Sequence, residues 1–393
     1  MDKIDELLTR GVDKIYPSKE ALEKVLRSGK KLRLYQGFDP SGIQLHIGHM
    51  TGLRKLRQWQ DLGHHVIFLI GDGTGQAGDP SGKTRAREKY LTRDELRKNA
   101  KDYVLQAHKV VRFEGENPAE ILYNSNWLNE LKLVDILNIE DHFSVQQLLE
   151  RDIFDTRKKE GQEIPLREFM YQLLQGYDSV AMKVDLELGG SDQTFNMLAG
   201  RKLVREILNK EKFVMTTPLL TDSQGKKIGK TEGNVIALNA PPKEFYGMIM
   251  SLSDDVIVKS FEYITDIPME EVKEIEKKIK AGENPMIYKK KLAFALTKML
   301  NSQNEAQVAQ EEFEKAFQQR QTPTDIAEYK LKSGQNIINV LLQSGISPSR
   351  SEAKRLIEQN AVELDGNLIS DISTQLEPGI LKVGKRRFLK IVL

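Results

Sequence analysis

Two histidines, His46 and His49, follow a short apolar segment and a turn, and this arrangement could bind a phosphate. The apolar run Leu32–Tyr35 predicts a strand, residues 39–42 predict a turn, and a helical pattern continues from the histidines to Trp59. A helix that begins at such a turn presents backbone N–H groups and its positive dipole end to an anion. Each imidazole can also donate a hydrogen bond to a phosphate oxygen. Surface histidines on a capped helix are the alternative interpretation.

A glycine-rich segment, residues 71–84, contains two patterns that resemble nucleotide-binding motifs. Residues 73–78 fit G-x-G-x-x-G, but the following sequence is polar and helical and lacks the second strand of a dinucleotide fold. Residues 78–84 resemble a phosphate-binding loop with one residue too few between its glycines. We therefore interpret the segment as a loop after the buried strand His65–Ile70, at the edge of a parallel sheet. Asp79 in this loop could bind a ligand ammonium group, or could simply form a turn before the next proline.

Three polar residues fall on one face of a helix that is predicted over residues 169–178. Tyr171, Gln175 and Asp178 recur at i, i+4 and i+7, so their side chains share one stripe of the helix. Apolar residues lie beside this stripe, which indicates that it faces a ligand. A solvent-exposed polar face is the alternative.

Two more predicted strands end in polar segments. Residues 184–188 predict a strand that is followed by two glycines and a capped helix, where Asp192 could accept a hydrogen bond from a ribose hydroxyl. Residues 216–222 predict another strand, followed by a loop rich in lysine and glycine. Lys227 and Lys230 in that loop could close on a polyphosphate. An exposed basic hairpin is the more common meaning of such a loop when it is considered alone.

The composition limits what kind of protein this is. The 393 residues are 39% hydrophobic and 30% charged, with a formal net charge of +2, as in ordinary soluble globular proteins. The absence of cysteine excludes disulfides, thiolate nucleophiles and thiolate zinc sites. The small net charge means that any nucleic-acid-binding surface must be local. No signal peptide and no run of about 20 apolar residues is present, so we expect a cytoplasmic protein without a membrane segment.

The predicted elements divide the chain into three parts. Alternating strands and helices predict an α/β fold with a Rossmann-like parallel-sheet core over residues 1–240, including a mostly helical connecting insertion at about 86–165. We expect residues 1–30 to be helical and the charged residues 151–164 to be mobile. Residues 241–325 predict an all-helical domain, and a polar linker at 318–330 leads to a small α+β domain.

The small domain, residues 331–393, holds nine basic and six acidic residues, a net charge of +3. Cations at the start of a predicted helix suit contacts with an RNA backbone; these are Arg350, Lys354 and Arg355. An ordinary charged surface is the alternative.

These motifs resemble, in their order along the chain, those of a known family. His46-Ile-Gly-His49 resembles one signature of the class I aminoacyl-tRNA synthetases, and Lys227-Ile-Gly-Lys-Thr231 resembles the second, lysine-containing signature loop. The segment Tyr35-Gln-Gly-Phe-Asp-Pro-Ser41 is similar, more narrowly, to the tyrosyl-tRNA synthetases. Residues 331–393 resemble the RNA-binding domain of the ribosomal-protein S-four type. The resemblance covers nearly the whole chain.

The resemblance implies a two-step reaction. The carboxylate of L-tyrosine attacks the α-phosphate of ATP, pyrophosphate leaves, and the tyrosyl group then moves to the 3′ end of tRNA(Tyr). ATP, with Mg²⁺, is implied as a substrate, while no permanently bound cofactor and no protein metal site are implied. A homodimer is implied through the connecting insertion. A tryptophanyl-tRNA synthetase-like enzyme, and an RNA-binding protein with a non-catalytic core, are the alternatives.

The family pattern also implies a role for each matching residue. Catalytic roles fall to His46, His49, Lys227, Lys230, Lys83 and Arg87. Tyrosine binding falls to Tyr35, Asp79, Tyr171, Gln175, Asp178 and Gln193. ATP binding falls to Asp39, Ser41, His46, Gly48, His49, Gly190, Asp192, Lys227 and Lys230. tRNA binding falls to Arg350, Lys354 and Arg355. This chain departs from many relatives in having Gln36 in place of Cys and Gly52 in place of Thr.

Overall fold

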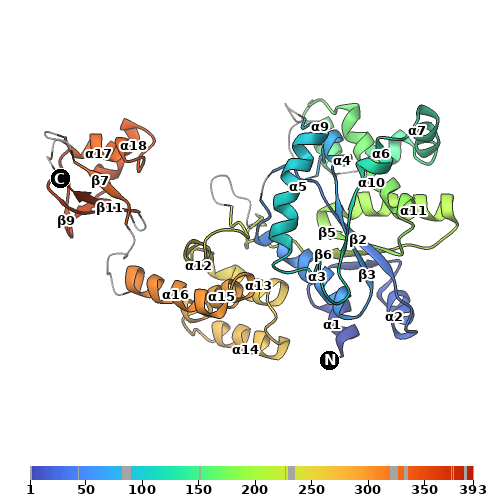
Figure 1. The fold of residues 1–393 in the computed structure, drawn as a ribbon, viewed down its shortest axis with the longest axis horizontal. Coiled ribbons are helices and arrows are strands. Elements are labelled where there is room, and N and C mark those ends of the chain that lie inside the picture. Colours follow the sequence, from blue (N-terminus) through green and yellow to red (C-terminus); the bar gives the residue numbers. More distant parts are fainter. Residues whose placement is uncertain are drawn as a thin grey trace. The chain divides into compact units, whose positions relative to one another are not determined.

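A computed structural model gives the fold. It describes residues 2–42, 44–81, 90–149, 152–225, 227–228, 235–318, 326–331, 335–372, 374, 376–384 and 387–392. The chain divides into two compact units, residues 1–306 and residues 307–393, each of which has its own sheet (Figure 1). The three-part division that the sequence suggests stays a prediction.

The first unit is built on a six-stranded sheet with the order β1-β6-β5-β2-β3-β4. Five neighbouring strands run parallel, and the edge strand β1 is antiparallel to β6. The strands are β1 (Lys14–Tyr16), β2 (Arg33–Phe38), β3 (His65–Ile70), β4 (Glu120–Tyr123), β5 (Leu186–Gly190) and β6 (Phe213–Thr217). The chain proceeds outward from β2 to β3 and β4 and then returns to place β5 on the other side of β2. This change of direction creates a switch point at the carboxyl ends of β2 and β5, where open α/β sheets bind ligands.

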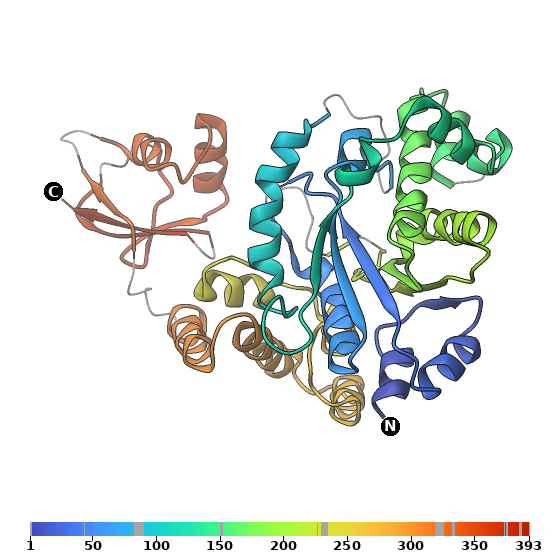
Figure 2. The same ribbon diagram turned by 45° about the vertical axis from the view of Figure 1, so that its right-hand side comes forward.

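Helices flank the sheet on both sides (Figure 2). Residues 66–70 of β3 are all buried, as expected for a strand that is covered on both faces. Helix α3 (Met50–Asp61) packs on β2, β3 and β5, while α11 (Thr194–Leu208) packs on β5 and β6. Helix α10 (Leu166–Ala181) lies along α11. These contacts confirm the predicted α/β class and the β2–α3–β3 unit.

The N-terminal region differs from the helical prediction. Helix α1 (Lys3–Thr9) ends earlier than the apolar spacing suggested, and β1 follows it before α2 (Lys19–Arg27). The edge strand forms because β6 offers an unpaired side, which no local pattern reveals. The predicted cap of α2 is confirmed, since Ser18 accepts a hydrogen bond from the backbone N–H of Ala21 at 3.2 Å. Strand β6 itself ends at Thr217, several residues before the predicted end of that strand.

The region between β3 and α10 is mostly helical, as predicted. Its elements are α4 (Thr74–Ala77), α5 (Arg93–Ala107), β4, α6 (Ser125–Leu128), α7 (Leu133–Glu140), α8 (Val145–Leu149) and α9 (Asp152–Lys159). Residues 152–159 of the charged segment form helix α9, and the expectation that residues 151–164 are mobile stays a prediction. Arg157 of α9 is buried and donates to Glu168 of α10 at 2.7 Å, so a tertiary ion pair holds this charged segment.

Between residues 242 and 318, all the regular elements are helices, as predicted for this part of the chain. They are α12 (Pro242–Met250), α13 (Ile257–Ile264), α14 (Met269–Lys280), α15 (Pro285–Leu300) and α16 (Gln303–Phe313). Helix α13 lies within this part that was predicted to be all-helical. This helix packs on α3, and Arg10 donates to the carbonyl oxygens of Phe261 and Thr265 at its carboxyl end. In the described residues, no helix is both long enough and apolar enough to cross a membrane.

The second unit contains a five-stranded sheet with the order β7-β11-β10-β8-β9. Its strands and helices are β7 (Glu328–Lys330), α17 (Ile337–Gln343), α18 (Arg350–Glu358), β8 (Val362–Leu364), β9 (Asn367–Leu368), β10 (Gly379–Val383) and β11 (Arg387–Val392). Strand β7 lies in the predicted linker and pairs in parallel with β11, which corrects that prediction. The apolar faces of α17 and α18 share one buried core with the sheet.

Candidate active site

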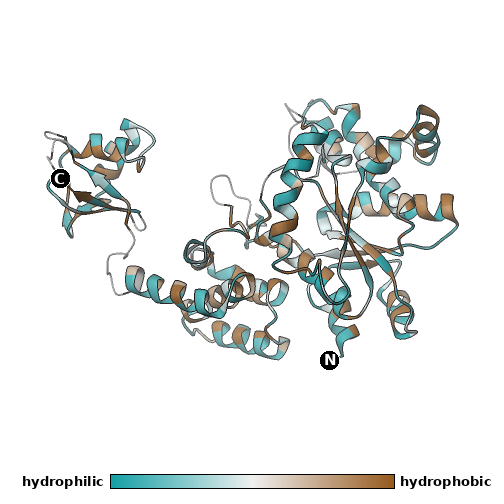
Figure 3. Cartoon of the chain, in the orientation of Figure 1, coloured by the Kyte–Doolittle hydropathy of each residue, from teal (hydrophilic) through white to brown (hydrophobic). Residues whose placement is uncertain are grey.

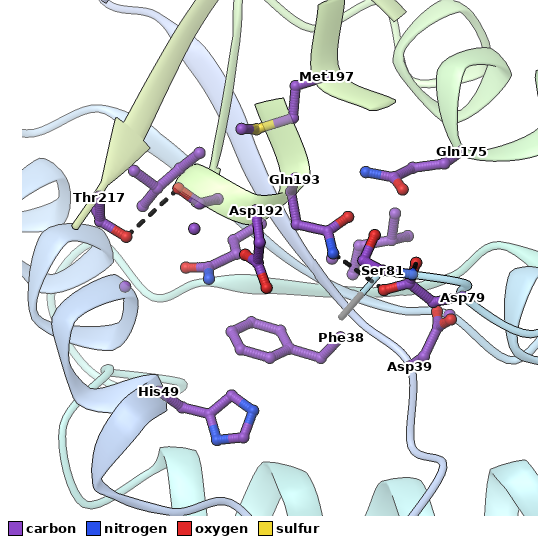
Figure 4. A pocket seen from close by; sticks show the side chains of 18 of the residues that line it. Phe38, Asp39, His49, Asp79, Ser81, Gln175, Asp192, Gln193, Met197 and Thr217 are labelled. Atoms are coloured by element: carbon purple, nitrogen blue, oxygen red, sulfur yellow. Dashed lines mark hydrogen bonds between the residues drawn. The ribbon is translucent and has the colours of Figure 1, made fainter. Parts of the chain in front are cut away.

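A cavity of about 310 Å³ opens at the predicted switch point of the first unit (Figure 4). The carboxyl ends of β2 and β5, the start of α3 and one face of α10 provide most of its wall. Most predicted site residues line it: Tyr35, Asp39, Ser41, His46, Gly48, His49, Asp79, Tyr171, Gln175, Asp178, Gly190, Asp192, Gln193 and Lys227. Lys83, Arg87 and Lys230 lie outside the described residues.

The two histidine rings lie against each other just before α3, tilted by 46°. Their ring centroids are 4.0 Å apart. His46 Nδ1 accepts from the backbone N–H of Gly48, and His49 Nδ1 accepts from the backbone N–H of His46, each at 3.1 Å. A neutral imidazole that accepts at Nδ1 carries its proton on Nε2, so both rings have an N–H donor at that atom. A Cβ atom at position 48 would lie 2.9 Å from the His46 ring, so only glycine fits there.

Two carboxylates and a phenol form a polar group beside the β2 end of the cavity. Asp39 accepts from Thr74 Oγ1 at 2.7 Å. Asp79 accepts from Gln193 Nε2 at 2.9 Å, and Figure 4 shows Gln193 extended toward it. Burial and the nearby carboxylates raise the pKa of Tyr171 well above its usual value, so its phenol stays protonated. The group offers a ligand ammonium both negative charge and acceptor atoms.

The buried end of the cavity holds Tyr35 and Asp178. Asp178 Oδ2 accepts from Asn124 Nδ2 at 3.0 Å, and Asp178 Oδ1 accepts from Trp127 Nε1 at 2.8 Å. Burial raises the pKa of Asp178 well above its usual range, while these two donors oppose the shift. The hydroxyl of Tyr35 lies 3.0 Å from Ser179 Oγ. The helix stripe predicted from Tyr171 to Asp178 therefore faces the cavity.

Asp192 and Lys227 form an ion pair at the opposite side of the cavity. Lys227 Nζ lies 2.7 Å from Asp192 Oδ2. The sequence suggested separate partners for them, a ribose hydroxyl and a polyphosphate, and the pair shows that both side chains reach the same place. A Cβ atom at position 190 would lie 2.6 Å from Asp192 Oδ1, so the glycine before this turn leaves room for the carboxylate.

Several residues around the cavity were missed by the sequence analysis. Asn124 and Trp127 follow β4, and a polar residue directly after a parallel strand was a usable signal for them. Glu187, Ser179 and Lys212 carried no comparable local signal, because their partners come from other elements. In the described part of the chain, no group of three or more acidic or histidine residues could hold a metal ion.

The predicted RNA-binding cations lie on α18 in the second unit. Arg350, Lys354 and Arg355 are exposed, while Ala353 and Ile357 of the same helix are buried. Ser349 caps the helix by accepting from the N–H of Glu352 at 3.2 Å. Arg355 also pairs with Glu352. The helix therefore presents basic side chains on its solvent face.

Two family models match the chain. One, described as tRNA synthetases class I (W and Y), matches residues 27–318, and one described as S4 domain matches residues 335–379. The first match covers the whole cavity, and it defines the class of protein as a class I aminoacyl-tRNA synthetase.

Similar curated proteins identify the family within this class. The chain is 42% identical over 391 residues to the tyrosine--tRNA ligase of Thermotoga maritima, which covers 98% of this chain and 96% of the relative. It is 42% identical to that of Carboxydothermus hydrogenoformans, with 98% and 97% covered. The chain belongs to the tyrosine--tRNA ligase family.

Solved structures agree at the level of the fold. A C-terminally truncated mitochondrial tyrosyl-tRNA synthetase of Aspergillus nidulans is 23% identical with a TM-score of 0.66, and the match covers 80% of this chain and 94% of that one. A tyrosyl-tRNA synthetase of Archaeoglobus fulgidus, complexed with L-tyrosine, is 19% identical with a TM-score of 0.61, covering 79% and 100%.

Proposed function

We propose that this chain activates L-tyrosine with ATP to give tyrosyl-adenylate and pyrophosphate, and then transfers the tyrosyl group to the 3′ end of tRNA(Tyr). The single observation that carries the specificity is the buried end of the cavity. There Asp178 and Tyr35 line the cavity, and each can form one more hydrogen bond beyond those it makes within the protein. A phenolic hydroxyl can give its hydrogen to Asp178 and accept one from Tyr35. A ligand without that hydroxyl forgoes both of these hydrogen bonds, and the tyrosyl enzymes are themselves a worked example of such discrimination against phenylalanine.

The polar group beside β2 binds the ammonium and carboxyl end of the tyrosine substrate. Asp79 and Tyr171, with Gln175, receive the ammonium of tyrosine, and Gln193 lies at its carboxyl group. Gln193 already donates to Asp79, so the two side chains are fixed in relation to each other. The tyrosine carboxylate then lies between the side chains that bind the ammonium group and the pair His46 and His49.

The part of the cavity that binds the phosphates of ATP carries out the activation of tyrosine. The reaction forms a bond between a carboxylate oxygen of tyrosine and the α-phosphorus of ATP and breaks the bond to pyrophosphate, so no covalent enzyme nucleophile is needed. The Nε2–H groups of His46 and His49 stabilise the charge that develops on the phosphates. Lys227, with Lys230, Lys83 and Arg87 by the family pattern, neutralises the leaving pyrophosphate. Positioning and charge stabilisation carry the rate enhancement.

The ribose and adenine part of ATP, which enters with Mg²⁺, lies toward β5. Asp192 accepts from a ribose hydroxyl once Lys227 leaves the ion pair for the polyphosphate. Gly48 and Gly190 give the nucleotide close access to the backbone, and Asp39 and Ser41 lie near its phosphates. The ion pair between Asp192 and Lys227 supports this role, because it places both side chains at the same side of the cavity, where a partly exposed pair can separate when each group gains a ligand partner.

A homodimer is proposed through α7 and α8. Leu133 and Val134 are 73% and 57% exposed, and Val145 is 66% exposed, so these large apolar side chains meet solvent. Figure 3 shows the hydropathy of the residues along each helix. Leu166 at the start of α10 is 76% exposed. Exposed apolar residues that cluster in this way mark interaction surfaces. The second copy of this chain is the partner that the family pattern implies.

The tRNA contacts are proposed for the second unit. Arg350, Lys354 and Arg355 form a basic helix face that suits the phosphates of an RNA. Since the substrates are those of protein synthesis, we expect the protein in the cytoplasm.

The test is ATP–pyrophosphate exchange without tRNA, with tyrosine, phenylalanine and tryptophan compared. Exchange with tyrosine alone is expected. Exchange with tryptophan would replace the proposal by the tryptophanyl alternative, and no exchange with any of the three would favour an RNA-binding protein with a non-catalytic core. The Asp178→Ala variant provides the control for specificity, since it should lose tyrosine-dependent exchange by several orders of magnitude while Leu105→Ala, on the exposed face of α5, should not.

A further inference from the structure

A buried ionic cluster lies directly behind the closed end of the cavity. It consists of Ser179 on α10, Glu187 on β5 and Lys212 just before β6, all of which are buried. Lys212 Nζ donates to Ser179 Oγ at 2.7 Å and forms an ion pair with Glu187. Gln175 Nε2 also donates to Glu187, at 3.2 Å. Glu187 is itself part of the cavity wall, and the cluster contacts two further wall residues, Gln175 and Tyr35. The proposed reaction uses none of the three cluster residues.

The packing of two helices makes room for this cluster. A Cβ atom at Gly200 of α11 would lie 2.7 Å from Lys212 Nζ and 2.9 Å from Ser179 Oγ. A Cβ atom at Gly176 of α10 would lie 3.2 Å from the backbone nitrogen of Gly200. Glycines at these two positions let α10 and α11 approach closely and leave space for the lysine head group between them. The cluster is thus packed into the interior of the fold and is not an ion pair on the surface.

The hydrogens of the cluster can be assigned by counting donors. A lysine ammonium only donates, so Ser179 Oγ accepts from Lys212 and keeps one hydrogen to give. Two acceptors lie within reach of that hydrogen: Tyr35 Oη at 3.0 Å and Glu187 Oε2 at 3.4 Å. Glu187 Oε2 already receives the lysine, and its distance is at the limit for a hydrogen bond. Tyr35 Oη is the nearer of the two acceptors, so we assign the hydrogen of Ser179 to it.

This assignment fixes the direction of the Tyr35 hydroxyl. Because its oxygen accepts from Ser179, its own hydrogen points away from Ser179 and toward the cavity, which the carboxyl groups of Asp178 and Glu187 also line. We propose that Lys212, Glu187 and Ser179 form a positioning relay that holds the Tyr35 hydroxyl as a hydrogen-bond donor toward the phenolic oxygen of the amino-acid substrate. The inference rests on the proposed tyrosine specificity. Lys212 fixes Ser179, Ser179 fixes Tyr35, and Asp178 then receives the substrate's own hydrogen.

A purely structural ion pair would explain the cluster less well. Taking an ammonium and a carboxylate out of water is expensive, and an apolar pair of similar volume is often as stable. Burial lowers the pKa of Lys212, and the carboxylate of Glu187 works against that shift. A relay gives the charged pair a use that apolar residues cannot supply, because only a donor can set the direction of the serine hydroxyl.

The test is a double-substitution cycle with Tyr35→Phe and Ser179→Ala, read as KM and kcat for tyrosine in pyrophosphate exchange. Ser179→Ala alone should raise the KM for tyrosine about five- to tenfold, the effect of one hydrogen bond, with little change in kcat. In the Tyr35→Phe background, Ser179→Ala should add less than about a twofold effect, because the hydroxyl that it orients is gone. Equal effects of Ser179→Ala in both backgrounds would overturn the relay and leave a structural role.

The Lys212→Met variant provides a second test of the same relay. It should raise the KM for tyrosine by a similar factor while leaving the inhibition constant of phenylalanine, which lacks the hydroxyl, within about twofold. Lys210→Met is the matched control, because Lys210 pairs with Asp185 and does not contact Ser179. If Lys212→Met weakens phenylalanine and tyrosine equally, the relay is wrong. If wild-type protein shows no exchange with tyrosine, the proposed function has failed instead, so the two failures are distinguishable.

Discussion

The indole nitrogen of Trp127 donates to Asp178 Oδ1 at 2.8 Å, although the two residues are 51 positions apart in the chain. Trp127 belongs to α6, just after β4, and Asp178 to α10. With Asn124, this indole holds a buried carboxylate in one orientation. The carboxylate can then present its remaining lone pairs to a ligand hydroxyl.

Replacing Trp127 by Phe should weaken tyrosine binding. The variant loses a hydrogen bond to a charged group, so the KM for tyrosine should rise about tenfold while kcat changes less. Steady-state pyrophosphate exchange measures both constants. Trp59→Phe is the control, because the Trp59 indole nitrogen has no hydrogen-bond partner among the described residues. An unchanged KM in the Trp127 variant would show that Asn124 alone holds Asp178.

Gln36 and Gly52 should behave as a coupled pair. A Cβ atom at position 52 would lie 2.5 Å from Gln36 Nε2 and 2.6 Å from Gln36 Oε1, so Gly52→Ala must push this carboxamide into the cavity. We expect Gly52→Ala to raise the KM for ATP about fivefold. In a Gln36→Ala background the same change should have less than about a twofold effect. Additive effects would mean that the two positions act separately.

His64 should make the stability of the first unit depend on pH. Its Nδ1 accepts from the backbone N–H of Leu32 at 3.1 Å, and burial lowers its pKa to about 4 from an ordinary value of 6.5. Between these two values the unfolded chain binds a proton that the folded chain does not. The free energy of unfolding should therefore fall as the pH drops from about 6.5 to about 4, by at most about 1.4 kcal/mol per pH unit.

Urea unfolding followed by tryptophan fluorescence tests this, since Trp59 packs edge-on against His64 with ring centroids 4.8 Å apart. The His64→Gln variant should show a smaller loss of stability over that pH range. His108→Gln, at an exposed position, is the control and should keep the wild-type slope. An equal slope in wild type and His64→Gln would contradict the assignment.

Charge placed on α7 should dissociate the proposed homodimer. Leu133→Glu puts a carboxylate into an apolar interface, which should raise the dimer dissociation constant by at least about 100-fold. Analytical ultracentrifugation over a range of concentrations measures this. Leu105→Glu on α5 is the matched control, since Leu105 is similarly exposed at 69%. A monomeric wild-type protein, or equal effects of both variants, would refute this interface.

Local sequence patterns predict much of the secondary structure and side-chain placement in the catalytic part of the protein. The spacing of His46 and His49 after a strand and a turn predicts their helix start, and the i, i+4, i+7 stripe predicts that Tyr171 and Asp178 share a face. Both features depend on residues close in sequence, where the geometry of a helix or a strand end fixes directions. For the same reason, the buried strand β3 is predicted with its correct bounds, His65–Ile70.

The tertiary structure alone decided which of these groups meet. Strand β5 enters the sheet beside β2, and this brings Ser179, Glu187 and Lys212 behind Tyr35. The ion pair of Arg157 with Glu168 joins a charged segment to α10, and the edge strand β7 forms only because β11 pairs with it. Such contacts join residues far apart in the chain, and their free energy comes from burial and pairing that no local spacing records.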